Sequence, residues 1–239
     1  MAEMAALMKQ DVVFDKVRES IEVYQPRPTD IIITPFGKCG TIWTQQIFHT
    51  LRTRGDMEFD DISRVVPWLE TSLGLGIDIN AEQKVEPRGF KSHLSYDKIP
   101  QGARYINVIR HPVDASYSAF RFMEGWYLEP GAVSADEYAL ARLQDASYYK
   151  HFISWWPHRG DENMLYLVYE HMIDDLMLRR LTEERLLPSG SDSAKVRVGK
   201  VGVHEFSSEV VETMDQIWRE VVLPVTGFEA YEELMDSLR

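Results

Sequence analysis

The sequence is poor in cysteine. Cys39 is the only one in 239 residues, so the chain cannot form an internal disulfide. A lone cysteine is typical of proteins in a reducing compartment. Long apolar stretches are missing too, since no run approaches the roughly 18 apolar residues of a membrane-spanning helix. Residues 1–9 carry Glu3 and only a short apolar run, a poor match to a secretion signal. These absences predict a cytoplasmic protein without a membrane partner.

Basic residues are also in short supply. The 26 lysines and arginines are outnumbered by 38 aspartates and glutamates, which gives a formal net charge of -12. Such a surface opposes general nucleic-acid binding, so we expect no nucleic-acid partner, although a local basic pocket for a nucleotide is compatible with it. The length suits one domain with a sizeable core, and we predict a single domain over residues 1–239.

Residues 30–46 carry the most informative pattern, DIIITPFGKCGTIWTQQ. The consecutive isoleucines predict a strand buried on both faces, as in a parallel sheet. A loop with Lys38 and Gly40 follows, and apolar spacing then predicts a helix from Thr41 to about Thr53. Free amides and the positive end of the helix, beside a lysine, suit a phosphate-like anion. The alternative is an ordinary loop with a solvated lysine.

Two familiar phosphate-binding loops fit this stretch poorly. A Walker nucleotide loop has glycine where Ile32 stands, and a Ser or Thr for Mg²⁺ where Cys39 stands. A cysteine phosphatase has an arginine where Gln45 stands. Residues 36–43, FGKCGTIW, instead resemble the 5′-phosphosulfate loop of the cytosolic-type sulfotransferases, usually YPKSGTTW. The lysine, glycine, first threonine and tryptophan are kept.

A candidate base follows a second predicted strand near residues 88–92. Lys91 and His93 are two residues apart, so strand alternation points both side chains the same way. A base beside an anion-binding lysine is what transfer to a hydroxyl requires. For His93 taken alone, the alternative is a surface histidine without a catalytic role. Residues 91–94, KSHL, resemble the KTHL segment of the same family, in which the histidine is the general base.

Two more segments resemble the 3′-phosphate signatures of the family. Arg110, Asp114 and Ser118 keep the spacing Arg-x-x-x-Asp-x-x-x-Ser after a third predicted strand. Residues 197–202, RVGKVG, are similar to Arg-Lys-Gly-x-x-Gly, with a valine in place of the lysine. The usual Asp-Trp-Lys that follows is replaced by residues 203–205, VHE, so this signature is degraded.

Two aromatic segments complete the resemblance. Residues 165–172, which overlap a fourth predicted strand at 164–170, match a Leu-Tyr-Leu-x-Tyr-Glu-Asp-Met pattern except at His171, and a helix is expected at about 172–187. The resemblance places Tyr169 near the adenine of a bound nucleotide. Residues 148–156 carry a matching Tyr-x-x-His-x-x-x-Trp-Trp helix, whose aromatic side chains we expect in the core.

The fold class follows from the order of elements. Strands near 30–34, 88–92, 105–109 and 164–168, with helices between them, predict an α/β protein with a mostly parallel central sheet flanked by helices. Ligands of such sheets bind at the carboxyl ends of the strands, where the family segments fall. Two remaining segments, 55–86 and 123–147, look irregular. Either they line an acceptor pocket, with Trp68, Trp126 and Tyr127, or they only pack.

The resemblance covers about residues 24–220 and implies an activity. It implies transfer of a sulfuryl group from 3′-phosphoadenosine 5′-phosphosulfate, held by a P-loop-like phosphosulfate-binding loop, to a hydroxyl or amine of a small, apolar or aromatic acceptor. The catalytic residues it implies are His93 as general base, Lys38 and Lys91. The donor-binding residues it implies are Lys38, Cys39, Gly40, Thr41, Ile42, Trp43, Arg110, Ser118, Tyr169, Arg197, Val198 and Gly199. No metal is expected.

Several questions stay open at the level of sequence. A nucleotide kinase or NTPase and a non-catalytic binder of adenosine bisphosphates are the alternative functions. The acceptor and the oligomeric state are not specified. Cys39, beside Lys38 at a helix N-terminus, is either a thiol of lowered pKa that is open to oxidation or a plain substitute for serine.

Overall fold

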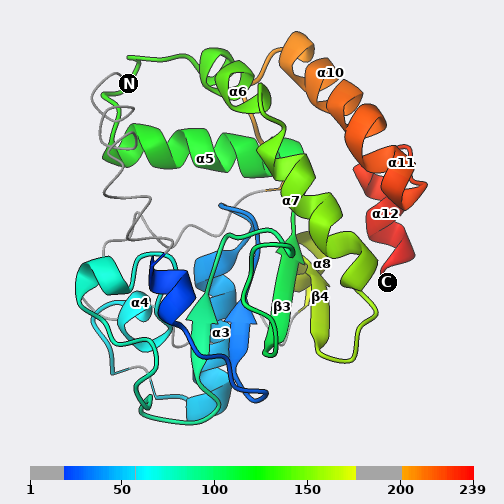
Figure 1. The fold of residues 1–239 in the computed structure, drawn as a ribbon. Coiled ribbons are helices and arrows are strands. Elements are labelled where there is room, and N and C mark those ends of the chain that lie inside the picture. Colours follow the sequence, from blue (N-terminus) through cyan, green and yellow to red (C-terminus); the bar gives the residue numbers. More distant parts are fainter. Residues whose placement is uncertain (1–18, 57, 176–200) are drawn as a thin grey trace.

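A parallel sheet lies at the centre of the computed structural model, which describes residues 19–56, 58–175 and 201–239 (Figure 1). Its four strands run in the order β2-β1-β3-β4, and all neighbouring pairs are parallel. The strands are β1 Ile31–Ile33, β2 Gly89–Lys91, β3 Arg104–Ile109 and β4 Met164–Val168. The predicted α/β fold with a parallel sheet is therefore confirmed.

Helices surround this sheet, and α3 packs against β1 and β2. In Figure 1, α5 crosses beyond one end of the strands, and α10, α11 and α12 lie along one side of the molecule. No helix in the described ranges is long and apolar enough to cross a lipid bilayer. The helical elements are α3 Thr41–Thr53, α4 Ile62–Val65, η1 Leu73–Leu75, α5 Pro112–Trp126, α6 Ala135–Leu143, α7 Ser147–Trp155, η2 Trp156–His158, α8 Tyr169–Asp174, α10 Ser208–Ile217, η3 Trp218–Val222, α11 Leu223–Thr226 and α12 Tyr231–Ser237.

The register of the sheet brings its functional ends together. Ile32 of β1 lies opposite Phe90 of β2 and Tyr105 of β3. Beyond β1, the backbone N–H of Thr34 still donates to the Ile106 carbonyl (2.8 Å). Because parallel strands end at the same edge, the segments that follow β1, β2 and β3 all start from one side of the sheet.

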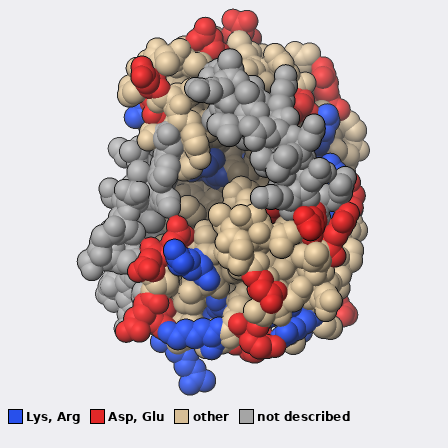
Figure 2. All heavy atoms as spheres, turned by 60° about the vertical axis from the view of Figure 1, so that its left-hand side comes forward, with Lys and Arg blue, Asp and Glu red and all other residues tan. Residues whose placement is uncertain are grey.

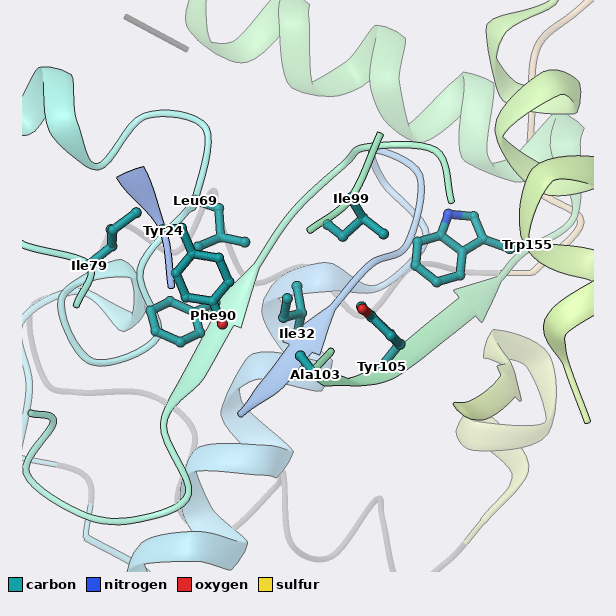
Figure 3. Packing of buried hydrophobic residues seen from close by; sticks show 9 residues of the cluster. All are labelled: Tyr24, Ile32, Leu69, Ile79, Phe90, Ile99, Ala103, Tyr105 and Trp155. Atoms are coloured by element: carbon teal, nitrogen blue, oxygen red, sulfur yellow. The ribbon is translucent and has the colours of Figure 1, made fainter. Parts of the chain in front are cut away.

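Two aromatic-rich cores hold the layers together. Figure 3 shows the first, where the Ile32 side chain of β1 lies among buried residues from β2, β3, α7 and the connecting segments. Its members are Tyr24, Ile32, Leu69, Ile79, Phe90, Ile99, Ala103, Tyr105 and Trp155. The second core packs Tyr149, Phe152 and Trp156 against Trp218 of η3. The aromatic residues of 148–156 are thus core, as the sequence predicts.

A buried ion pair joins the start of β1 to the start of β2. The side chains of Asp30 and Arg88 are 0% and 1% exposed, and the guanidinium donates two hydrogen bonds to the carboxylate, at 2.9 and 2.6 Å. Asp30 also accepts from the Tyr24 hydroxyl (2.7 Å) and the Arg27 amide (2.9 Å). Full pairing is what allows two charges to stay in a dry interior.

Some expectations were wrong, and local contacts explain why. Residues 123–147 are not mostly loop, since α5 continues to Trp126 and α6 follows. Helix α6 begins with a capping box, in which Ser134 accepts from the Glu137 amide (3.2 Å) and the Glu137 carboxylate accepts from the Ser134 amide (2.9 Å). The helix expected from 172 begins at Tyr169, and its predicted part beyond residue 175 lies outside the described residues.

The segment 55–86 is irregular, as expected, and its described residues form only the short helices α4 and η1. It is fixed partly by Arg52 of α3. The Arg52 guanidinium donates to the Val65 carbonyl (2.6 Å), the Pro87 carbonyl (3.0 Å) and the Gln83 side chain (2.7 Å). These bonds tie the middle of the segment and its C-terminal end to α3.

We expect Arg88→Met to lower the free energy of unfolding by about 3–5 kcal/mol, because the Asp30 carboxylate stays buried without its charged partner. Urea unfolding followed by circular dichroism measures the change. Arg27→Met is the control, since its side chain pairs with Glu82 at the exposed surface, where such a pair contributes at most about 1 kcal/mol. Equal effects of the two substitutions would contradict a structural role for the buried pair.

Candidate active site

The loop between β1 and α3 is shaped for an anion. Lys38 and Gly40 both have positive φ, 71° and 88°, and the Cys39 amide donates to the Phe36 carbonyl (3.2 Å) to close the turn. Gly40 is the N-cap of the 13-residue α3, and no side chain caps that end of the helix. The first amides of α3 and its positive dipole end are therefore directed at the space in front of the loop.

Gly40 is required for a second reason. A Cβ atom at this position would lie 2.7 Å from the ring of Tyr169, at the start of α8. The Tyr169 ring also contacts Trp43 edge-on, with ring centroids 5.7 Å apart, and the Arg110 guanidinium lies 4.5 Å from the Tyr169 centroid. Gly40, Trp43, Arg110 and Tyr169, which come from different parts of the chain and are all predicted to hold the donor, are thus brought together.

The Arg110 guanidinium is held beside Tyr169, and some of its N–H groups are left for a ligand. Its side chain is buried, and one guanidinium nitrogen donates to the Lys38 carbonyl (3.1 Å). Its own carbonyl accepts from the Tyr148 hydroxyl. The Arg110 Nε and the Thr41 Oγ1 are buried without a hydrogen-bond partner. Buried polar atoms normally find partners, so these two fit a bound anion.

The other predicted 3′-phosphate residues divide into three cases. Asp114 is buried, and both of its carboxylate oxygens accept from the Gly202 amide (3.1 and 3.0 Å), so it fastens α5 to the chain at 201–202. Ser118 lies two turns into α5 and is half-buried. Arg197, Val198 and Gly199 lie outside the described residues.

Hydrogen bonds hold both the backbone and the ring of His93, which follows the end of β2. Its ring Nδ1 lies 2.7 Å from the Pro35 carbonyl, which can only accept, so Nδ1 carries the proton and Nε2 keeps its lone pair. Its backbone amide donates to the Glu70 carboxylate (2.7 Å). Burial lowers the pKa of His93 to about 4; the Pro35 hydrogen bond opposes this shift, and the charges of Lys91 and Lys38 add to it. The imidazole is therefore a neutral base near pH 7.

The ammonium groups of the two lysines at the site each lie over an aromatic ring. The Lys91 Nζ lies 4.7 Å from the centroid of Trp68, whose ring also meets His93 edge-on at 5.3 Å. The Lys38 Nζ lies 4.2 Å from the centroid of Phe122 on α5. Trp68 therefore belongs to the site, whereas its neighbours Val66 and Leu69 are fully buried in the core. The interpretation of this segment as core is thus confirmed for Val66 and Leu69, while a role of Trp68 in the wall of an acceptor pocket stays a prediction.

Sequence reasoning missed two residues at the site. Phe122 is one, although its position one helical turn after Ser118 placed it on the same side of α5. His151 is the other; it is buried, its ring lies 5.6 Å from that of Phe36, and its Nε2 has no hydrogen-bond partner. Burial, and then the nearby His93, lower the pKa of His151 to about 3.

Two other aromatic residues were candidates for the acceptor pocket. The side chain of Trp126 lies outside the described part of the structure, and Tyr127 is exposed.

The charge around the site contrasts with the acidic chain. Lys38, Lys91 and Arg110 all lie at or just after the carboxyl ends of strands β1, β2 and β3, although the formal net charge is -12. Figure 2 shows a basic side chain recessed in one face of the molecule, while acidic side chains are spread over the outer parts of that face. Among the described residues, no three His, Cys, Asp or Glu side chains are grouped to hold a metal. Metal-free chemistry stays a prediction.

Cys39 behaves as a packed residue. Its side chain is 0% exposed, and burial raises the pKa of its thiol to about 12. The charges of Arg110 and Lys38 lower that pKa only in part. A thiol in this state is a weak nucleophile, which favours the interpretation of Cys39 as a substitute for serine.

We expect His93 to titrate with a pKa of about 4 in the folded protein, as followed by the chemical shift of its ring proton in NMR spectra assigned by comparison with His93→Ala. In urea the value should return to about 6.5. Between these two values the unfolded chain binds a proton that the folded chain does not, so His93 lowers the free energy of unfolding as the pH falls through this window. A folded-state value near 6.5 would contradict the buried, neutral base.

We expect Cys39 of the folded protein to react with a disulfide reagent at pH 8 at least about 100-fold more slowly than in urea, because both burial and the raised pKa suppress the thiolate. The released thiol is read by its absorbance, and the single cysteine makes the signal unambiguous. Similar rates in the folded and unfolded protein would restore the redox-sensitive interpretation.

Residues 28–179 match the family model described as "Sulfotransferase domain". Among characterised relatives, the chain is 29% identical to the amine sulfotransferase of Oryctolagus cuniculus over 67% of this chain and 56% of that protein. It is 28% identical to sulfotransferase 1E1 of Homo sapiens, over 71% of this chain and 62% of that protein. The chain thus spans about three fifths of the length of these relatives.

The fold is shared with solved structures of the same kind. The mouse sulfotransferase SULT7A1, solved in complex with PAP, superposes with a TM-score of 0.68 at 19% sequence identity, covering 94% of this chain and 93% of that one. This likeness concerns the fold, whereas the match over residues 28–179 concerns the sequence itself. The chain belongs to the sulfotransferase family.

Proposed function

We propose that this protein transfers a sulfuryl group from 3′-phosphoadenosine 5′-phosphosulfate to a hydroxyl or amine of a small, apolar or aromatic acceptor. The observation that carries the proposal is the hydrogen bond between His93 Nδ1 and the Pro35 carbonyl (2.7 Å), which fixes a neutral base beside the lysine-bearing loop. Family membership supports it, as do the activity named for the amine sulfotransferase and the PAP bound to the mouse structural neighbour.

The donor would be held by the buried basic end of the site. The α3 amides and the Thr41 hydroxyl suit the 5′-phosphate, while Arg110 and Ser118 suit the 3′-phosphate that distinguishes this donor from ATP. Trp43 and Tyr169 offer aromatic faces to the adenine. Arg197, Val198 and Gly199 are proposed for the 3′-phosphate on the family resemblance, and Cys39, Gly40 and Ile42 line the loop through their backbone.

The chemistry then divides among three side chains. When bound, the donor supplies an activated sulfuryl group, whose bond to the 5′-phosphate oxygen breaks as the acceptor oxygen or nitrogen bonds to sulfur. His93 Nε2 takes the acceptor proton. Lys38 stabilises the charge that grows on the departing phosphate oxygen, and Lys91 faces the sulfuryl oxygens. Placement and charge stabilisation dominate, as in loose phosphoryl-type transfer.

The side chains near His93 favour an apolar or aromatic acceptor. Trp68 and Phe122 present rings beside the two lysines, and the buried His151 adds one unpartnered nitrogen near His93. A planar acceptor can stack on such rings while its one polar atom meets the base.

A cytoplasmic location, a metal-free reaction, a single domain and the absence of a nucleic-acid partner are proposed together with this activity. The oligomeric state is left open.

We expect transfer of labelled sulfate from the donor to one class within a panel of phenols, alcohols, amines and sugars. His93→Ala should lower kcat by about 100- to 10,000-fold, as for loss of a general base, while adenosine 3′,5′-bisphosphate still binds. His158→Ala is the matched control, because His158 pairs with Asp161 at the surface. Nucleotide binding without turnover on any acceptor would favour a binding protein, and Mg²⁺-dependent ATP hydrolysis would favour an NTPase.

A further inference from the structure

Glu70 is a buried carboxylate that the proposed chemistry does not use. It is 7% exposed and lies in the irregular segment after α4, two residues from Trp68. Burial raises its pKa, and the amide of His93 opposes the shift by donating to Oε1 at 2.7 Å. The Trp68 indole lies close enough to lower the pKa further, without the geometry of a hydrogen bond. A carboxylate in this position costs free energy unless it has a specific partner.

The local backbone explains why the partner is His93. Residues 67–69 run parallel to the end of β2, since the Lys91 amide donates to the Pro67 carbonyl (2.9 Å) and the Leu69 amide donates to the Lys91 carbonyl (3.0 Å). Regular parallel pairing would next join the His93 amide to the Leu69 carbonyl. That carbonyl instead accepts from the Ser20 hydroxyl. The Glu70 side chain takes the place of the missing backbone acceptor.

His93 is consequently fixed by two segments at once. Glu70 holds its backbone amide, and the Pro35 carbonyl of the anion-binding loop holds its ring. The ring bond selects the tautomer with Nε2 unprotonated, but it forms only if the backbone presents the ring at the right place. Neither bond alone determines where Nε2 points.

We propose that Glu70 is the positioning residue for the base: through the His93 amide it holds the imidazole in the Nδ1–H tautomer with Nε2 directed at the acceptor. The proposal rests on the function proposed above for His93. The role requires an acceptor atom and not a charge. Glu70→Gln should therefore preserve it, whereas Glu70→Met, of similar volume but without an oxygen, should remove it.

The test compares these two variants by NMR and by kinetics. Two-bond ¹⁵N–¹H spectra of the ligand-free protein report the His93 tautomer directly. We expect the Nδ1–H tautomer in the parent and in Glu70→Gln, and a mixture of tautomers in Glu70→Met. We also expect Glu70→Met to lower kcat by about 10- to 100-fold, the cost of a slightly misplaced base, with unchanged affinity for adenosine 3′,5′-bisphosphate. Glu70→Gln should stay within about 3-fold of the parent.

Gln45→Ala is the matched control, because Gln45 is another buried side chain that tethers this segment, through the Val66 carbonyl (2.9 Å), without touching His93. It should leave the tautomer unchanged. An unchanged tautomer in Glu70→Met would overturn the proposal, as would equal damage from Glu70→Gln. If Glu70→Met does not fold, as judged by circular dichroism, Glu70→Ala replaces it. The tautomer is measured on the ligand-free protein, so the role of Glu70 is tested even if no acceptor is sulfated and the proposed function fails.

Discussion

The paired charges of Asp30 and Arg88 are the constraint on which the rest of the structure depends. They lie where β1 and β2 begin, and they fix how far one strand is displaced along the other. Once that register is set, the opposite ends of the same strands deliver the Lys38 loop and the Lys91–His93 pair to one edge. A slip of one residue would turn Lys91 and the base to the other face of the sheet. The ion pair is far from the chemistry, yet it determines which residues can meet there.

The loop between β1 and α3, residues 34–40, contributes atoms to both halves of the site. Its amides face the space proposed for the donor, and its Pro35 carbonyl accepts from the ring of His93, the proposed base. Any ligand that displaces this loop therefore displaces the acceptor of the Nδ1 proton as well. The Gly40–Tyr169 contact and the bond from Arg110 to the Lys38 carbonyl keep such displacements small. The proposed donor and acceptor halves of the site are thus joined through backbone atoms of this loop.

Local patterns predicted the sheet and the loop well, because both depend on short stretches of sequence. The isoleucines of 31–33 predicted a strand with two buried faces, and the stretch after them predicted a loop that leads into a helix at Thr41. Helix α6 was missed because the capping box at Ser134 was not read, although it is visible in sequence. The contact of Glu70 with His93 could not be read, since it depends on a carbonyl diverted to Ser20 from a distant part of the chain. The place of the Trp68 ring beside Lys91 and His93 was left open by the sequence, because an irregular segment gives no periodicity to separate this ring from its buried neighbours.

The aromatic supports of the two lysines have a consequence for how fast and how tightly an anion can be captured. A long lysine side chain in water samples many rotamers, and immobilising it costs up to about 2 kcal/mol of conformational entropy. Here the Nζ atoms of Lys38 and Lys91 already lie over the rings of Phe122 and Trp68. Part of that ordering is thus completed during folding, and less of it is left for the moment of binding. The contact of an ammonium group with a ring is weaker than its contact with an anion, so the same geometry that orders the two lysines costs little to give up.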